Sequence, residues 1–235
     1  MLTLDVATGA RGSEAWVIRR LGAMSEQRRV NPLAQATAEV ARREPVFAQL
    51  IELHGPVRLG PKPAVGARFE VLARAIAFQQ LAGAAARTIW GRVRALVPGE
   101  FTPEAVLALD DAQLAGAGLS GAKRAALLDL ALHVADGRVE LERMGRMPDE
   151  QVVAELVQVR GIGTWTAEMF LLSSLRRLDV WPVTDLGVRN GWGRAFGLQT
   201  PPTPKELAVL GERFAPCRSV VAWYCWRACD AVLPG

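Results

Sequence analysis

The chain has 235 residues, of which 50% are hydrophobic and 22% are charged, with a net charge of +4 and a pI near 9.4. This length is ample for a buried core in one large or two small domains. No apolar run approaches the ~20 residues of a membrane span, and the N-terminus carries no secretory pattern, so we expect a cytoplasmic protein without a membrane partner.

The basic charge balance is compatible with nucleic acid, although no dense run of lysine and arginine marks a binding face. Cys217, Cys225 and Cys229 are odd in number, and without a secretion pattern they indicate reduced thiols. His54 and His133 are the only histidines. We therefore expect neither disulfides nor a zinc site.

Residues 1–30 mix glycine, arginine and threonine around one apolar run, and Met24 is an alternative start. We expect a partly disordered extension there, or a short helix or strand. From Asn31 onward apolar residues recur at helical spacing, and strand-like alternation is scarce. The sequence thus predicts an all-α fold of about ten helices. The main helices are expected over residues 33–43, 46–53, 67–78, 84–97, 123–135, 151–158, 164–175, 186–196 and 218–232.

Short-range patterns predict several helix ends. Asp110 with Gln113, and Thr203 with Glu206, have the spacing of a capping box, in which each side chain bonds the other residue's backbone N–H. Gly137 follows the helix expected over residues 123–135, and glycine readily adopts the left-handed conformation that ends a helix.

The stretch from Leu156 to Asp185 organises the rest of the chain. Two helices meet there at Gly161-Ile162-Gly163, where glycines on either side of one aliphatic residue allow a tight turn. The turn leaves backbone N–H groups uncovered at the start of the second helix, where the helix dipole favours an anion such as phosphate. Asp185 follows in the loop after that helix, placed to act on whatever the turn holds.

The segments GIGTWTAEM (161–169) and WPVTDLGVR (181–189) resemble the helix-hairpin-helix DNA glycosylases and, among them, the 3-methyladenine DNA glycosylase II (AlkA) family. The resemblance covers roughly residues 31–232. It implies two helical lobes with a DNA-binding cleft, a hairpin at about 151–175 at their junction, and no N-terminal β domain of the kind that longer relatives carry. The lobes would comprise residues 31–66 with 183–235, and residues 67–182.

The resemblance implies a hydrolase of base excision repair that flips an alkylated purine out of DNA and cleaves its N-glycosidic bond. Asp185 would be the catalytic residue, because a carboxylate stabilises the positive sugar in the transition state and orients the attacking water. The residues alone leave another role open, since aspartate is also a good N-cap for the helix that follows. Both roles are compatible.

Trp165 stands where relatives that also cut the DNA strand carry a lysine that forms a Schiff base. The resemblance therefore implies a monofunctional enzyme that leaves an abasic site and has no lyase activity. Trp165 would line the base pocket, where an indole attracts a cationic base; the alternative is plain core packing. Met169, Leu186 and Cys217 stand where the family often has aromatic residues, which predicts a wide pocket and a broad range of alkylated bases.

By resemblance, the hairpin would bind phosphates of the lesion strand; the alternative is a turn that binds no ligand.

Base flipping also needs a residue that fills the vacated stack. By resemblance this is Gln80, with Leu81 as the alternative, unless the helix end that carries them is buried. The predicted DNA-binding residues are Arg160, Gly161, Ile162, Gly163, Thr164, Thr166, Gln80 and Leu81.

No organic cofactor is implied. Backbone carbonyls of Val157, Val159 and Ile162 would hold a structural Na⁺ or K⁺, and three cysteines cannot supply the four-cysteine iron–sulfur cluster of some relatives.

We expect a monomer whose partner is double-stranded DNA containing alkylated bases. Two other classes of protein stay open, namely a non-catalytic helix-hairpin-helix DNA-binding module and a helical protein-interaction scaffold.

Overall fold

The computed structural model describes residues 31–81 and 83–230, and every regular element in them is a helix, so the all-α prediction is confirmed. The expected structure of residues 1–30 and the end of the last helix lie outside this range. None of the described helices is long and apolar enough to cross a membrane. The elements are α2 Pro32–Arg43, α3 Pro45–His54, η1 Val65–Ala67, α4 Arg68–Phe78, α5 Gly83–Ala95, α6 Pro103–Leu107, α7 Asp111–Gly116, α8 Gly121–Ala135, η2 Met144–Arg146, α9 Asp149–Leu156, α10 Thr164–Phe170, η3 Leu171–Leu175, α11 Leu186–Ala195, α12 Pro204–Glu212 and α13 Arg218–Asp230.

The helix ends follow the local sequence closely. Both predicted capping boxes are present, Asp110 with Gln113 before α7 and Thr203 with Glu206 before α12. Gly137 has a φ of 77°, which ends the turn after α8. One prediction was wrong in detail, because the helix expected over 164–175 continues beyond Phe170 as the π-helical segment η3. No sequence pattern marks that change.

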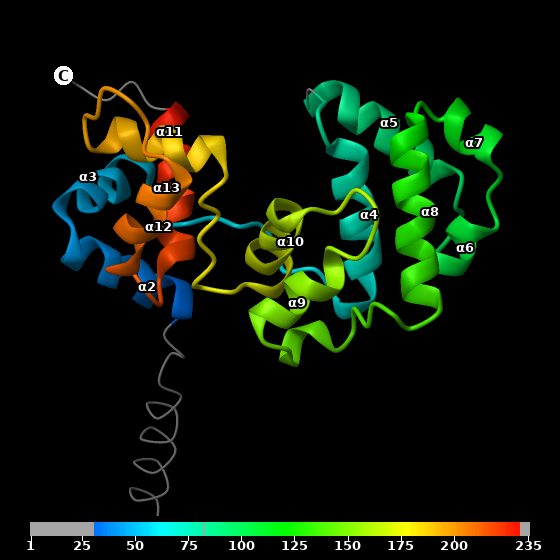
Figure 1. The fold of residues 1–235 in the computed structure, drawn as a ribbon, viewed down its shortest axis with the longest axis horizontal. Helices are drawn as coiled ribbons and strands as arrows, with labels where there is room; N and C mark the ends of the chain where they lie inside the picture. Colours follow the sequence, from blue (N-terminus) through cyan, green and yellow to red (C-terminus); the bar gives the residue numbers. More distant parts are fainter. Residues whose placement is uncertain (1–30, 82, 231–235) are drawn as a thin grey trace, which may run out of the picture.

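The buried apolar side chains form two separate cores. The first core gathers residues between Phe69 and Val180, from α4 to η3 and the loop after it. The second core joins α2 and α3 to residues from Trp181 to Ala228. In Figure 1 the helices of the second core lie together at the left and α4 to α8 at the right, with α10 drawn between them. The lobe boundaries drawn from the sequence stay a prediction, and this division of the cores supports them.

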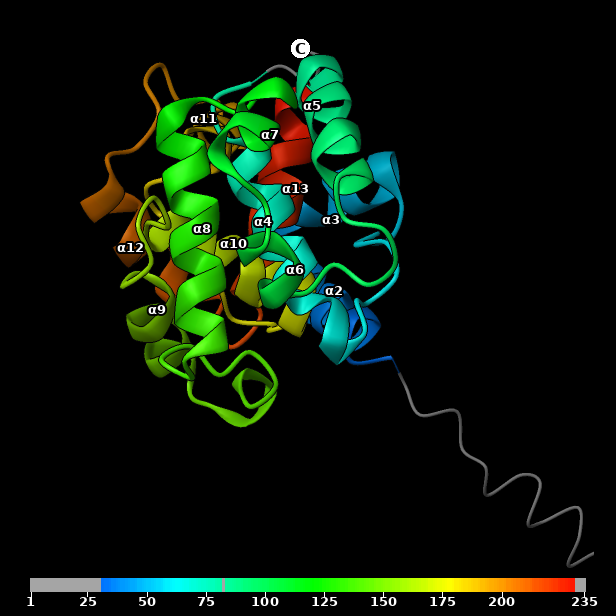
Figure 2. The same ribbon diagram turned by 90° about the vertical axis from the view of Figure 1, so that its right-hand side faces the viewer.

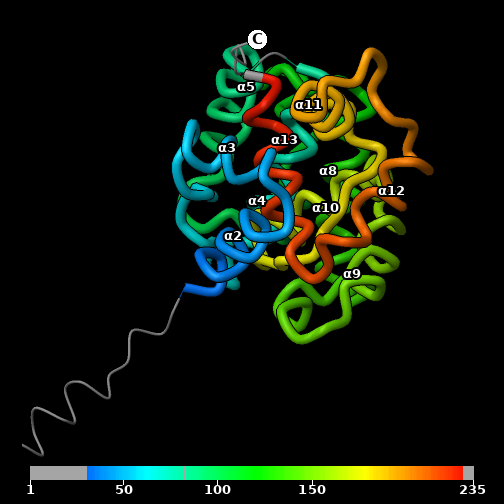
Figure 3. The backbone as a smooth tube through the Cα atoms, turned by 90° about the vertical axis from the view of Figure 1, so that its left-hand side faces the viewer, coloured from blue at the N-terminus to red at the C-terminus, as the bar shows by residue number. Residues whose placement is uncertain are grey.

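The second core is rich in aromatic rings. Phe47 of α3 packs edge-on against Phe214 at a centroid distance of 5.3 Å, and Trp192 of α11 stacks on Phe196 at 4.5 Å. Figure 3 shows why residues so distant in sequence meet, because the blue α2 and α3 lie against the red α13. The two ends of the described chain therefore build one core.

The first core is arranged around α4 and α8. Figure 2 shows α8 along the near side of the molecule, with α4 and α10 behind it. Lys123 at the start of α8 donates to the carbonyl of Ala77 near the end of α4, at 2.8 Å. This bond holds the end of α4 beside the hairpin described below.

Candidate active site between the two cores

The hairpin of α9, the turn 157–163 and α10 is built as the glycines predict. Gly161 has a φ of 77°, a conformation that costs other residues free energy. The amide of Ile162 donates to the carbonyl of Val159 at 3.0 Å, and both side chains are buried in the first core. The side chains of Val159 and Ile162 thus pack the turn against the first core, while Gly161 and Gly163 are exposed to solvent.

Not every amide of the turn is available to a ligand. The amide of Arg160 donates to the Asp129 carboxylate of α8 at 2.7 Å, and that of Ile162 is used within the turn. Among the described residues, the amides of Gly161 and Gly163 and those of residues 164–166 at the start of α10 make no hydrogen bond, whereas the amide of Ala167 donates to the Gly163 carbonyl at 3.1 Å. The anion-binding part of the prediction therefore narrows to these amides at the start of α10.

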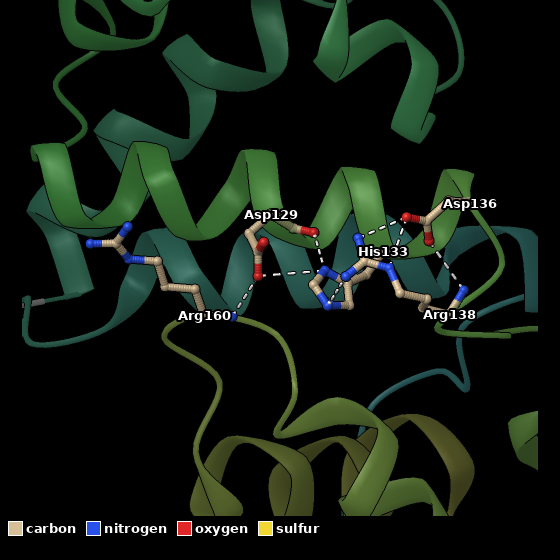
Figure 4. Close-up of polar contacts among 5 residues, drawn as sticks. All are labelled: Asp129, His133, Asp136, Arg138 and Arg160. Atoms are coloured by element: carbon tan, nitrogen blue, oxygen red, sulfur yellow. Dashed lines mark hydrogen bonds and ion pairs between the residues drawn. The ribbon is translucent and has the colours of Figure 1, made fainter.

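A network of hydrogen bonds and ion pairs at α8 holds the Asp129 carboxylate beside the hairpin turn (Figure 4). His133, one turn along α8, places Nδ1 2.8 Å from the Asp129 carbonyl and 3.5 Å from its carboxylate. Arg138 donates to Nε2 of His133 at 2.9 Å and also binds Asp136. Because a guanidinium only donates, Nε2 accepts and Nδ1 carries the proton toward Asp129.

We expect Asp129→Ala to loosen the hairpin, because the Arg160 amide then loses its charged acceptor. Such a hydrogen bond contributes about 1.5–3 kcal/mol. Amide hydrogen exchange of Arg160 should accelerate, and the salt-dependent affinity for duplex DNA should fall. Glu140→Ala, an exposed carboxylate that accepts from Arg143 outside this network, is the matched control. An Arg160 amide that stays equally protected in Asp129→Ala would contradict this role.

Asp185 lies where the two cores meet, and three N–H groups from three helices hold its carboxylate. The amide of Val188 in α11 donates to Oδ1 at 2.7 Å, so Asp185 is the N-cap of α11. The indole of Trp226 in α13 donates to Oδ1 at 2.9 Å, and the indole of Trp165 in α10 donates to Oδ2 at 2.5 Å. Capping thus leaves Oδ2 directed toward the hairpin helix.

Trp165 is 45% exposed, which excludes the alternative of plain core packing. Trp226 is half-buried and packs against both cores. Trp226 was not predicted as a site residue from the sequence. Gly187 makes the approach of Trp226 possible, since a Cβ there would lie 2.9 Å from the indole Cδ1.

Glu168 is a second carboxyl group of the site that the sequence analysis missed. It lies on α10 one turn after Trp165 and is half-buried. Burial first, and then the charge of Asp185, raise the pKa of Glu168 to about 7. Nothing in the pattern GIGTWTAEM marks this residue, because its surroundings come from the tertiary fold.

The family model that describes the HhH-GPD superfamily of base excision DNA repair proteins matches residues 73–217. The chain belongs to this superfamily. It is 33% identical over 201 residues to DNA-3-methyladenine glycosylase 1 of Schizosaccharomyces pombe, covering 84% of this chain and 88% of that one. It is also 36% identical over 193 residues to DNA-3-methyladenine glycosylase of Saccharomyces cerevisiae, covering 66% of this chain and 64% of that one.

Solved structures of the superfamily show the same fold. The S. pombe 3-methyladenine DNA glycosylase in complex with abasic DNA superposes with a TM-score of 0.75 at 32% identity, covering 84% of this chain and 98% of that one. A DNA-3-methyladenine glycosidase from Bacillus halodurans gives a TM-score of 0.73 at 34% identity, covering 85% and 89%. The hairpin and Asp185 therefore sit in a fold that this superfamily shares.

The three residues proposed as pocket walls differ in their exposure to solvent. Met169 is half-buried one turn from Trp165, and Leu186, directly after Asp185, is 62% exposed. Cys217 is 7% exposed and belongs to the second core, directly before α13 begins at Arg218. Its small apolar thiol fills space there, and burial raises the pKa of that thiol. A role of Cys217 as a pocket wall stays a prediction.

The segment after α4 is exposed rather than buried. Gln80 has a φ of 54° and Leu81 is 39% exposed. Gln79 donates through Nε2 to the carbonyl of Gly161 at 2.9 Å, which ties this segment to the hairpin turn. Gln80 and Leu81, the residues proposed to fill the vacated base stack, therefore lie beside the expected phosphate contacts. They are not packed in the core, as the alternative of a buried helix end would require.

The hairpin also offers carbonyl oxygens of the kind a monovalent cation binds. In the part of the chain that the structure describes, no hydrogen bond ends on the carbonyl of Val157 or Ile162, while Val159 accepts the amide of Ile162. Two of the three predicted ligands thus keep both lone pairs. A Na⁺ or K⁺ at this turn stays a prediction.

Proposed function

We propose that this protein is a monofunctional DNA glycosylase that hydrolyses the N-glycosidic bond of 3-methyladenine and related alkylated purines in duplex DNA. The observation that carries the proposal is the Asp185 carboxylate, held by two indoles and a helix amide beside the hairpin. The relatives' names supply the substrate class. The flipped nucleotide would occupy the space in front of Asp185 and Trp165.

The chemistry follows from the geometry. The base leaves with the bonding electron pair, and the sugar gains positive charge that the fixed carboxylate stabilises. Water, oriented by Asp185, then forms a bond to the sugar carbon and passes one proton to the Asp185 carboxylate. The exposed Trp165 ring offers a face to a cationic base, an attraction of about 0.5–2 kcal/mol. An alkylated, cationic purine already leaves readily, so no general acid is required.

Strand binding is assigned to the start of α10. The amides of Gly161, Gly163 and Thr164 would bind phosphate oxygens, and a Na⁺ or K⁺ on the turn carbonyls would add a positive charge there. Gln80 or Leu81 would fill the vacated stack. Such contacts carry no sequence information, so affinity should fall with salt and vary little with flanking sequence.

The test is base release. We expect the purified protein, incubated with methylated duplex DNA, to release 3-methyladenine, identified by mass spectrometry, and to leave sites that break only on alkali treatment. Strand breaks without alkali would contradict the monofunctional assignment, since Trp165 cannot form a Schiff base. DNA binding with no base released would instead support a non-catalytic hairpin module. A wide pocket predicts that 7-methylguanine and ethenoadenine are also released.

A further inference from the structure

Glu168 places an unpartnered carboxyl group beside Asp185. Its Oε2 is buried, and no hydrogen-bond partner for it exists among the described residues. Its pKa of about 7 means that roughly half of the molecules hold the proton at neutral pH. A buried polar atom without a partner costs free energy, so each such atom in a folded protein calls for an explanation.

The two carboxyl groups of the site have opposite surroundings. Asp185 accepts three N–H donors, whereas Glu168 accepts none. Neighbouring carboxyl groups in unlike surroundings take different roles, one ionised and one able to hold a proton. A positive charge that arrives beside Glu168 would supply the partner it lacks and favour its ionised form.

We propose that Glu168 is a specificity-determining residue that selects positively charged nucleotides over neutral ones. In the free protein its carboxyl group exchanges a proton with water near neutral pH, and part of the molecules hold that proton. When a cationic base or a positive sugar comes beside it, the O–H bond breaks, the electron pair stays on the carboxylate and the proton goes to water. The second negative charge then adds to that of Asp185. This inference rests on the proposed function and names the charge class of its substrate.

Among the described residues, the charged groups around α10 other than Asp185 do not affect the pKa of Glu168. Helix α9 and the segment η3 pack directly against α10. Among the described residues, Asp185 is the one charged group that acts on the pKa of Glu168. The charged or titratable side chains on neighbouring elements include Asp149, Glu150 and Glu155 of α9, Arg160 of the turn, Arg189 and Arg194 of α11, and Arg218, Tyr224, Cys225, Arg227 and Cys229 of α13.

The test compares two duplexes that differ at one nucleotide, a positively charged pyrrolidine abasic analogue and a neutral tetrahydrofuran analogue. Affinities are measured by fluorescence anisotropy from pH 6 to pH 8. With a pKa of about 7, the ionised fraction of Glu168 rises from about one tenth to about nine tenths over this range. The preference for the charged duplex should therefore grow about tenfold with pH in the wild-type protein.

Glu168→Gln should remove this rise, because the amide cannot ionise. Glu155→Gln is the matched control, since Oε2 of Glu155 is also buried without a partner among the described residues, and it should keep the wild-type response. A preference that rises equally in Glu168→Gln and wild type would overturn the proposal. So would a wild-type preference that does not change with pH.

The variant is expected to fold. In the wild type, Glu168 holds its proton more tightly in the folded state, so the contribution of Glu168 to stability is fully present below a pH of about 4.5 and is lost as the pH rises through 7. Glu168→Gln lacks this loss and should melt at a higher temperature than wild type at pH 8. A second readout needs no variant, because carboxyl-carbon NMR should show the pKa of Glu168 falling with the charged duplex alone. An unchanged pKa would overturn the proposal.

Failure of this inference is distinct from failure of the proposed function. If the wild-type protein releases no base from methylated DNA, the proposed glycosylase activity is wrong. If it releases alkylated bases while its preference for the charged duplex is independent of pH, only the role of Glu168 is wrong.

Discussion

Asp185→Asn should reduce the rate of base release by a factor of about 10²–10⁴, the range found when one charge-stabilising or proton-transferring group is removed. Asparagine caps helices as well as aspartate does, so α11 should still begin at Leu186. The amide carries no charge, and its one acceptor oxygen, kept at the cap, can still accept from Val188 and Trp226. Its NH₂ group then takes the place of Oδ2 and cannot accept the indole N–H of Trp165. The sugar then develops its positive charge without a carboxylate beside it.

Single-turnover excision from methylated DNA measures the effect, and anisotropy on the same duplex should show that binding persists. Asp110→Asn is the matched control, because Asp110 is also a helix N-cap, before α7, away from the site. It should leave excision unchanged. Near-normal base release by Asp185→Asn would remove Asp185 from the mechanism and, with it, the main argument for catalysis at this junction.

The sequence predicted what depends on near neighbours in the chain. The capping boxes at Asp110 and Thr203 and the turn at Gly161 are present because their hydrogen bonds and dihedral angles involve residues only a few positions apart. The family pattern pointed to Asp185 and Trp165, which the structure joins by a hydrogen bond. Their roles in the reaction stay predictions.

What the sequence missed depends on packing between distant segments. Trp226 reaches Asp185 only because α13 lies against α11, and Glu168 loses its water only because the hairpin is packed on the first core. The burial of Cys217 in the second core was not marked by the sequence either, since its position in a motif does not reveal which way it faces. Exposure and electrostatic surroundings are tertiary properties, and one sequence without an alignment does not encode them locally.

The contact between α11 and α13 is therefore the part of the fold on which the site most depends. Gly191 of α11 meets the main chain of α13 so closely that an added Cβ would lie 1.8 Å from the carbonyl oxygen of Cys225. No side-chain rotation relieves a contact with backbone, so the helices would have to separate by more than an ångström in a close-packed core. Trp226, the next residue, holds the carboxylate that caps α11.

We accordingly expect Gly191→Ala to destabilise the protein by about 4 kcal/mol or more, the range of mutations that break a packed core. Gly91→Ala in α5 is the control, because no atom lies within 4 Å of its added Cβ, and it should stabilise by about 0.5–1 kcal/mol. Chemical denaturation measures both. If Gly191→Ala folds with wild-type stability, α11 and α13 tolerate a wider spacing, and the hydrogen bond from Trp226 to Asp185 would then depend on something other than this close approach.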